Sequence, residues 1–212
     1  MKKINFSKFI ILILIFLASS CIPNQLKPGG PVEDEVSQLI RNAPPAELYP
    51  DAGIINLLDE SIVEVFEDGR HKETLHVVFK VLNEKGKDKG DIEIGYNSRT
   101  QTASIIYART ITPEGKIIPL NENAIKVVTP YSSYPSYSEY KELTFSMPGV
   151  TVDSIVDYKV AIEQKTPEIE GKFSSGFYFQ MYDPTYLCRY KVITPEDMDL
   201  KYHVMGVQLK VK

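Results

Sequence analysis

The sequence predicts an all-β domain built as an antiparallel, immunoglobulin-like β-sandwich. Short segments in which apolar and charged residues alternate follow one another at intervals of roughly 8–14 residues, and no long helical pattern separates them. In the clearest segment the apolar residues are Val156, Tyr158, Val160 and Ile162, and the charged residues are Asp157, Lys159 and Glu163. This alternation predicts one apolar and one solvated face, as in a sheet packed on one side only.

An export signal is predicted over residues 1–20. Three lysines precede an unbroken apolar run, Phe9 to Leu17, which is shorter than the roughly 20 residues that span a bilayer and suits a signal peptide. Small residues then lead to Cys21. This ending resembles a bacterial lipoprotein signal, in which the cysteine becomes the lipidated first residue, although Ala18 stands where such signals usually carry leucine. We therefore expect an exported protein anchored through Cys21 to the cell envelope, at a periplasmic or surface face and in the outer membrane.

Residues 21–49 are expected to form the lipidated cysteine, a tether and one short helix. Prolines and glycines over residues 22–31 suppress regular structure. Over Glu33–Asn42 the apolar residues gather on one side, which predicts a helix that the following two prolines end. The sandwich is then expected to occupy residues 50–212.

The strands of the sandwich are expected in chain order, between turns. Besides residues 156–162, the alternating apolar sets are Leu75, Val77, Phe79 and Val81; Ile92, Ile94 and Tyr96; and Leu143, Phe145 and Met147. Asp68-Gly69 and Thr112–Gly115 have the residues of tight turns, and Met147–Gly149 is a further break.

The charge balance excludes two classes of function. The chain has 24 basic and 28 acidic residues, for a net charge of −4, and removing the signal lysines makes it more acidic. Nucleic-acid binding needs a basic face, and so does electrostatic docking on anionic lipid. Attachment to the membrane is therefore expected to depend on the lipid of Cys21, and no nucleic-acid partner is expected.

No catalytic residue, metal site or cofactor is expected. If Cys21 is acylated, Cys188 is the remaining thiol, and its strand pattern beside Tyr186 and Tyr190 predicts a packed core cysteine. His71 and His76 lie five residues apart on one predicted strand, so they point to opposite faces and cannot form a ligand pair. The paired acidic residues are interpreted as solvated surface charges.

One stretch, Thr129–Tyr140, has the composition of a recognition surface. Tyr131, Tyr134 and Tyr137 alternate with serines and prolines, a mixture that combines rigid aromatic area with adaptable hydrogen bonding. The commoner arrangement, which we favour, is a long loop whose tyrosines pack on the sandwich edge. Tyr140 is expected to pack in either case.

Several motifs occur in a familiar order. They are Leu57-Leu58-Asp59-Glu60, Glu67-Asp68-Gly69-Arg70, Thr112-Pro113-Glu114-Gly115, Phe145-Ser146-Met147-Pro148-Gly149 and Phe177-Tyr178-Phe179-Gln180. Over about residues 50–206 the chain resembles the domain of unknown function that lies N-terminal to transglutaminase-like domains in many bacterial exported proteins. That resemblance implies a β-sandwich followed by a papain-like core with Cys, His and Asp, whereas this chain stops at Lys212. We expect either a stand-alone sandwich or a truncated copy of a longer protein.

Two functions are compatible with these features. The first is a lipid-anchored binding module, with no catalysis of its own, that takes a protein or peptide partner. The alternative is an accessory or truncated N-terminal part of a transglutaminase-like or cysteine-protease-like protein, whose catalytic core is on another chain or lost. A transglutaminase-like core is then the expected partner.

Overall fold

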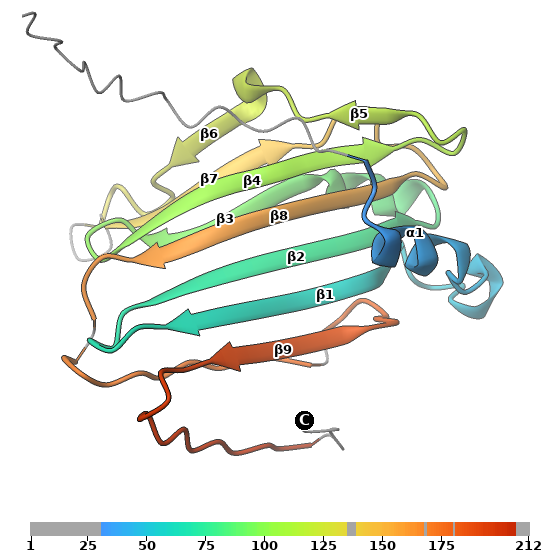
Figure 1. The fold of residues 1–212 in the computed structure, drawn as a ribbon. Helices are drawn as coiled ribbons and strands as arrows, with labels where there is room; N and C mark the ends of the chain where they lie inside the picture. The colour runs from blue at the N-terminus through green and yellow to red at the C-terminus, as the bar shows by residue number, and fades with distance from the viewer. Residues whose placement is uncertain (1–30, 135–138, 168, 180, 207–212) are drawn as a thin grey trace, which may run out of the picture.

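The alternating segments form the strands of two packed sheets (Figure 1). The computed structural model describes residues 31–134, 139–167, 169–179 and 181–206. The expected signal and tether, Cys21 and Tyr137 lie outside the described residues. Within them, no helix is long and apolar enough to cross a membrane.

The larger sheet has six strands in the order β5-β4-β8-β2-β1-β9. They are β1 (Ile54–Val65), β2 (His71–Val81), β4 (Gln101–Ile111), β5 (Ile117–Pro119), β8 (Ile155–Gln164) and β9 (Cys188–Ile193). The smaller sheet has the order β3-β7-β6, formed by β3 (Asp91–Asn97), β6 (Ile125–Val128) and β7 (Tyr140–Ser146). All neighbours are antiparallel except β1 and β9. The antiparallel sandwich is confirmed.

The expected helix forms as α1 (Asp34–Arg41), and three short 3₁₀ segments follow it along the chain. These are η1 (Ala46–Leu48), η2 (Glu84–Gly90) and η3 (Glu122–Ala124). The Asp68-Gly69 turn joins β1 to β2, and Gly69 adopts a φ of +86°, which a residue with a side chain rarely accepts.

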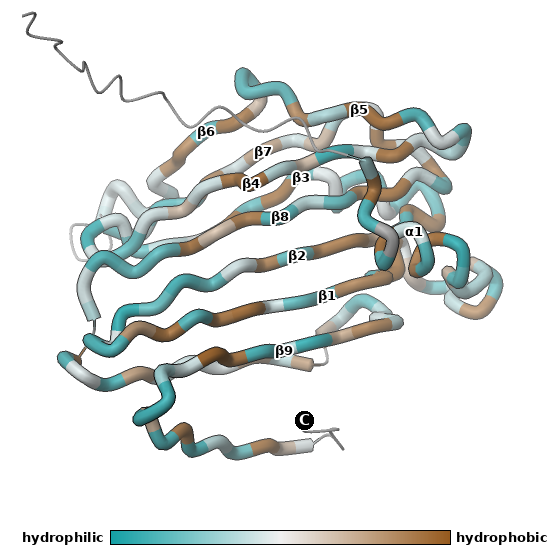
Figure 2. The backbone as a smooth tube through the Cα atoms, viewed as in Figure 1, coloured by the Kyte–Doolittle hydropathy of each residue, from teal (hydrophilic) through white to brown (hydrophobic). Residues whose placement is uncertain are grey.

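Two hydrophobic clusters hold the fold together. The first lies between the sheets and includes Phe79, Phe145 and Tyr158. The second lies on the opposite face of the six-stranded sheet, where Val36 and Leu39 of α1 pack on buried residues of β1, β2, β4 and β8. Figure 2 shows that β2 becomes hydrophobic toward its end nearest α1. The prediction that the sheet is packed on one side only is therefore wrong at this end.

Asp157, expected to be a solvated charge, is fully buried beneath α1. Its Oδ2 accepts hydrogen bonds from Arg109 Nε and Nη2, both at 2.8 Å. Its Oδ1 lies 3.0 Å from His76 Nε2 and accepts a hydrogen bond of 3.1 Å from the Tyr107 hydroxyl. Arg109 and His76 are almost fully buried as well. The carboxylate thus joins three adjacent strands, β4, β8 and β2.

A β-bulge in β4 accounts for the position of two of these side chains. The register between β4 and β8 shifts between Ile105 and Tyr107. Ile105 and Ala108 consequently pack in the cluster between the sheets, while Tyr107 and Arg109 point to the face that α1 covers. Without the extra residue, Ile105 and Tyr107 would share a face.

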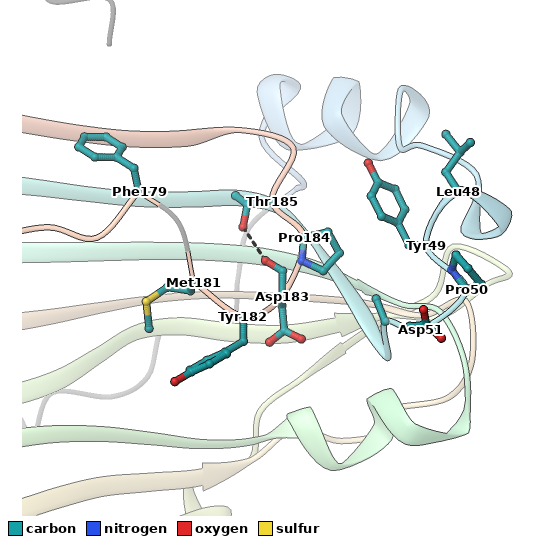
Figure 3. Close-up of a pocket in the computed structure, with 11 residues that line it drawn as sticks. Leu48, Tyr49, Pro50, Asp51, Phe179, Met181, Tyr182, Asp183, Pro184 and Thr185 are labelled. Carbon is teal, nitrogen blue, oxygen red and sulfur yellow. Dashed lines mark hydrogen bonds between the residues drawn. The ribbon is translucent and has the colours of Figure 1, made fainter. Parts of the chain in front are cut away.

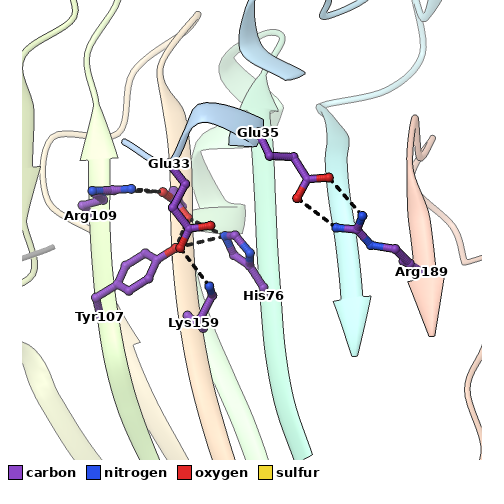
Figure 4. Close-up of polar contacts among 8 residues, drawn as sticks. Glu33, Glu35, His76, Tyr107, Arg109, Lys159 and Arg189 are labelled. Carbon is purple, nitrogen blue, oxygen red and sulfur yellow. Dashed lines mark hydrogen bonds and ion pairs between the residues drawn. The ribbon is translucent and has the colours of Figure 1, made fainter. Parts of the chain in front are cut away.

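The polar contacts continue across the sheet to the first turn of α1 (Figure 4). Tyr107, Lys159, His76, Glu60 and Arg189 stand opposite one another on five successive strands. Lys159 Nζ lies 3.0 Å from Glu33, and Arg189 forms a two-pronged ion pair with Glu35 at 3.0 and 3.1 Å. The helix is therefore held by two ion pairs as well as by its apolar side.

We predict that Asp157→Asn lowers the free energy of unfolding by about 3–5 kcal/mol, because it removes the buried negative charge that pairs with the Arg109 guanidinium. Urea denaturation followed by circular dichroism measures the change. The matched control on the same strand is Glu163→Gln, which removes only an exposed ion pair with Lys72 and should cost less than about 1 kcal/mol. Equal effects of the two substitutions would contradict the assignment.

The same carboxylate makes stability depend on pH. Burial alone would raise the pKa of Asp157, but the hydrogen bond from His76 and the charge of Arg109 outweigh it and hold the pKa below its ordinary value. Its contribution to stability is therefore complete above the ordinary carboxyl pKa and is lost as the pH falls through the folded-state value.

Candidate functional site

A groove of about 630 Å³ opens at the end of the sandwich that carries α1. Residues 48–52, just after α1 and η1, form one wall, and residue 179 with residues 181–185, just before β9, form the other. Figure 3 shows these two walls facing each other across the opening. Segments about 130 residues apart in the sequence therefore build one site.

Local hydrogen bonds fix the first wall. Two prolines end α1, and η1 then turns the chain, with Tyr49 N bonded to Ala46 O at 2.9 Å. The next turn is closed by a bond of 3.1 Å from Ala52 N to Tyr49 O. Directly after it, Gly53 packs against the backbone of Gly86 so closely that neither position has room for a Cβ atom. The wall is thus attached to η2.

The second wall is attached to the start of β1. Asn56 N donates to Pro184 O at 2.9 Å, and Tyr186 N donates to Asn56 O at 2.8 Å. Lys89 Nζ, from η2, adds an ion pair of 2.9 Å with Asp183. Both walls therefore rest on the same corner of the sandwich, which gives the groove a fixed width.

The groove is lined by aromatic rings, prolines and two carboxylates. Its aromatic and proline residues are Tyr49, Pro50, Phe179, Tyr182 and Pro184. Tyr182 is fully exposed, at 100% relative accessibility, and the neighbouring Met181 is exposed by 57%. Asp51 and Asp183 are the only charged residues among the described residues that line it. No hydrogen bond or ion pair of the Asp51 carboxylate is found within the described part of the chain.

Sequence reasoning missed this site. No spacing of residue types along the chain connects Tyr49 to Tyr182, because their proximity depends on how the segment before β9 is attached to β1. The only local signal is Met181-Tyr182-Asp183-Pro184, which places two large apolar side chains in a turn-forming context.

Tyr131 and Tyr134, two of the tyrosines predicted as a binding surface, follow β6, whose last residues lie at the opposite end of the sandwich (Figure 1). Tyr131 and Tyr134 are 48% and 64% exposed, as a contact surface requires. Tyr137 lies outside the described residues. The Tyr131 ring lies 5.7 Å from that of Tyr140, whose hydroxyl covers Gly95, so one side of the loop is packed. Binding by this loop stays a prediction.

The histidines lie as expected, on opposite faces of β2. His71 makes an edge-to-face contact of 5.3 Å with Phe173, whereas His76 is engaged by Asp157. Among the described residues, no three His, Cys, Asp or Glu side chains gather as a metal site would require.

Cys188 is half-buried on β9, opposite Asp59. Burial, with a smaller contribution from the Asp59 charge, raises the pKa of its thiol to about 11. Of the neighbours expected to be buried with it, Tyr190 is half-buried and stacked on Phe177, but Tyr186 is 51% exposed. The expectation for Tyr186 is wrong because β9 begins only at Cys188, so strand alternation does not extend back to it.

Comparison with known proteins identifies a family. The model of a family described as a domain of unknown function with a solved structure, DUF3857, matches residues 67–211. No curated protein matches the chain significantly.

Two solved structures illustrate what the chain is similar to. A "putative protease" from Parabacteroides distasonis is 18% identical with a TM-score of 0.58, covering 68% of this chain and 29% of that protein. The likeness shows the fold alone, and this chain matches less than a third of that protein's length. A CBM3a-L domain of the scaffoldin cipA from Clostridium thermocellum gives a TM-score of 0.34 at 12% identity, covering 60% of this chain and 79% of that domain. The latter score does not indicate a shared fold.

We predict that the Cys188 thiol reacts with iodoacetamide at pH 8 roughly a hundredfold more slowly than an unperturbed thiol, because so little thiolate is present. The measurement uses the mature chain with Cys21→Ser, so that only one thiol can react, and the urea-unfolded chain supplies the reference rate. Fast alkylation of the folded chain, lost in Cys188→Ala, would reveal an activated cysteine instead.

Proposed function

We propose that this chain, which belongs to the DUF3857 family, is a lipid-anchored, exported binding module whose ligand site is the groove between residues 48–52 on one side and residues 179 and 181–185 on the other. The observation that carries the proposal is Tyr182, whose ring is fully exposed at a concave site built on rigid supports. An exposed aromatic residue costs solubility and contributes nothing to the core, so its presence in a groove favours a role in contact.

Binding without catalysis is the function that this site supports. The described residues that line the groove include no cysteine, histidine or serine that could serve as nucleophile or base. One of the two carboxylates, Asp183, is held in an ion pair. Cys188, with its raised thiol pKa, belongs to β9 and lies outside the lining. We therefore infer that the chain has no acyl-transfer activity of its own.

The anchor places the groove near a membrane. Twelve residues separate Cys21 from Asp34, where α1 begins, and a chain of that length reaches at most roughly 40 Å. Since α1 leads directly into the first wall of the groove, anchoring through Cys21 would hold the binding end, rather than the tyrosine-loop end, close to the lipid surface.

We predict that Cys21→Ser abolishes membrane attachment. A single acyl chain binds membranes only marginally. Bacterial lipoproteins, whose signal this one resembles, carry several acyl chains on the cysteine, and together these anchor the protein stably. Detergent phase partitioning and the mass of the mature chain are the measurements. The Cys188→Ser variant, which keeps the lipidation site, is the control and should partition like the wild type. Unchanged partitioning of Cys21→Ser would exclude lipid anchoring at this residue.

The groove itself is tested with two panels of probes, short synthetic peptides and cell-wall oligosaccharides, titrated into the mature chain carrying Cys21→Ser. We expect at least one probe to shift NMR resonances of residues 48–52 and 181–185, and Tyr182→Ala to weaken its binding about tenfold or more, as for an aromatic contact residue. Glu163→Gln, which changes an exposed residue outside the groove lining, should bind like the wild type. No binding from either panel would overturn the proposal.

A second function is favoured by a separate observation, the distribution of exposed apolar side chains. Many of them gather late in the chain, at Ile169, Tyr178, Met181, Tyr182, Tyr186, Ile193, Leu200, Tyr202, Val204 and Met205. Such a concentration is typical of a surface that another folded domain covers. It supports an accessory role beside a transglutaminase-like or cysteine-protease-like core. If this second function is correct, the peptide and oligosaccharide probes would not bind the groove, and a purified transglutaminase-like or cysteine-protease-like domain would protect Tyr202 and Met205 from solvent.

A further inference from the structure

We propose that the ligand of the groove is a proline-containing peptide in the polyproline II conformation, with a lysine or arginine beside its prolines. This inference rests on the proposed function and adds the chemical class of the ligand. It follows from three properties of the lining: its rings and prolines, its engaged backbone and the sign of its charges.

The apolar part of the groove fits a rigid, ridged ligand. Tyr49, Phe179 and Tyr182 supply flat rings, and Pro50 and Pro184 supply further apolar surface on the two walls. A polyproline II helix presents proline rings at three residues per turn and is already ordered before it binds. Grooves lined by aromatic residues therefore bind such peptides at a low cost in conformational entropy.

The backbone of the groove does not favour the addition of a β-strand. Strand addition needs a row of free N–H and C=O groups along one wall. Here Pro184 O accepts from Asn56 N, the N–H groups of Tyr49 and Ala52 donate within their turns, and Pro50 and Pro184 have no N–H at all. A polyproline II peptide has no ladder to complete, so it suits walls of this kind.

The charges of the groove favour a cationic ligand. Its described charged lining residues are the two carboxylates, and within the described part of the chain a basic partner, Lys89, is found for Asp183 and none for Asp51. The nearby η2 segment carries Lys85 and Lys87 as well, but Glu84 pairs with Lys87 at 2.7 Å. Asp51 therefore remains available to an arginine or lysine of the ligand.

An oligosaccharide fits the same groove less well. Sugars stack on aromatic rings, but their hydroxyl groups also need donors and acceptors around the ring edge. Among the described residues that line the groove, the side-chain donors are the hydroxyls of Tyr49, Tyr182 and Thr185, and that of Thr185 already donates to Asp183 O at 3.3 Å. Carboxylates, which only accept, make up the rest of the polar lining side chains.

The test uses a synthetic peptide, Arg-Pro-Leu-Pro-Pro-Leu-Pro, and two variants, one with glutamate in place of arginine and one with glycine in place of every proline. Each is titrated by calorimetry into the mature chain carrying Cys21→Ser. We expect the parent peptide to bind, the glutamate variant to bind about fivefold more weakly, and the glycine variant to lose measurable binding.

Two substitutions in the protein locate the effect. Tyr182→Ala should weaken the parent peptide about tenfold, and Asp51→Asn should remove the preference for arginine over glutamate while leaving the melting temperature unchanged. Glu163→Gln, which changes an exposed residue outside the groove lining, is the control and should have no effect. Equal affinity for the proline and glycine peptides would overturn the inference.

The outcomes separate the inference from the proposed function. If a cell-wall oligosaccharide binds, with a loss in Tyr182→Ala, while the proline peptide does not bind, the groove is a ligand site but the peptide assignment is wrong. If no probe of either panel binds, both proposals fail together.

Discussion

The rest of the structure depends on one buried carboxylate. Asp157 has no exposed surface, and an ionised group in that position is tolerable only when it is paired and hydrogen-bonded. Its partners come from β4 and β2, on either side of its own strand β8, so satisfying the charge requires a single register of three strands. A shift by one residue in either pairing would turn a partner toward the opposite face and leave the carboxylate uncompensated.

Because that polar cluster is satisfied internally, a short helix can cover it. An eight-residue helix gains little stability on its own, so α1 depends on what it packs against. Val36 and Leu39 enter the second hydrophobic cluster, while Glu33 and Glu35 meet Lys159 and Arg189. The first wall of the groove follows this helix directly along the chain. The position of the groove therefore depends on the ion pairs that Lys159 of β8 and Arg189 of β9 form with the start of the helix.

The sequence predicted the strands well, but it did not predict which segments cover the faces of the sheets. Alternation along β2, β7 and β8 and the apolar side of α1 predicted these elements, since local periodicity reports which residues share a face. It could not reveal that one charged residue, Asp157, faces a helix rather than solvent. It could not locate the bulge before Tyr107 either, because no residue type marks a bulge unambiguously. The groove could not be predicted from the sequence for a related reason. Tyr49 and Tyr182 line the same groove only because both of its walls are attached to one corner of the sandwich.

That corner depends on Asn56. Its backbone bonds to Pro184 and Tyr186, and the register of β1 shifts between Asn56 and Leu58, which accommodates an additional residue just beside the groove. The second wall is thus fixed at Pro184 by a main-chain hydrogen bond and at Asp183 by the ion pair with Lys89, while the side chains of Met181 and Tyr182 stay exposed. A wall that is ordered by its backbone loses little conformational freedom when a ligand contacts its side chains. The attachment of this wall to β1 therefore explains both why Tyr182 can be fully exposed and why it can contact a ligand at a low cost in conformational entropy.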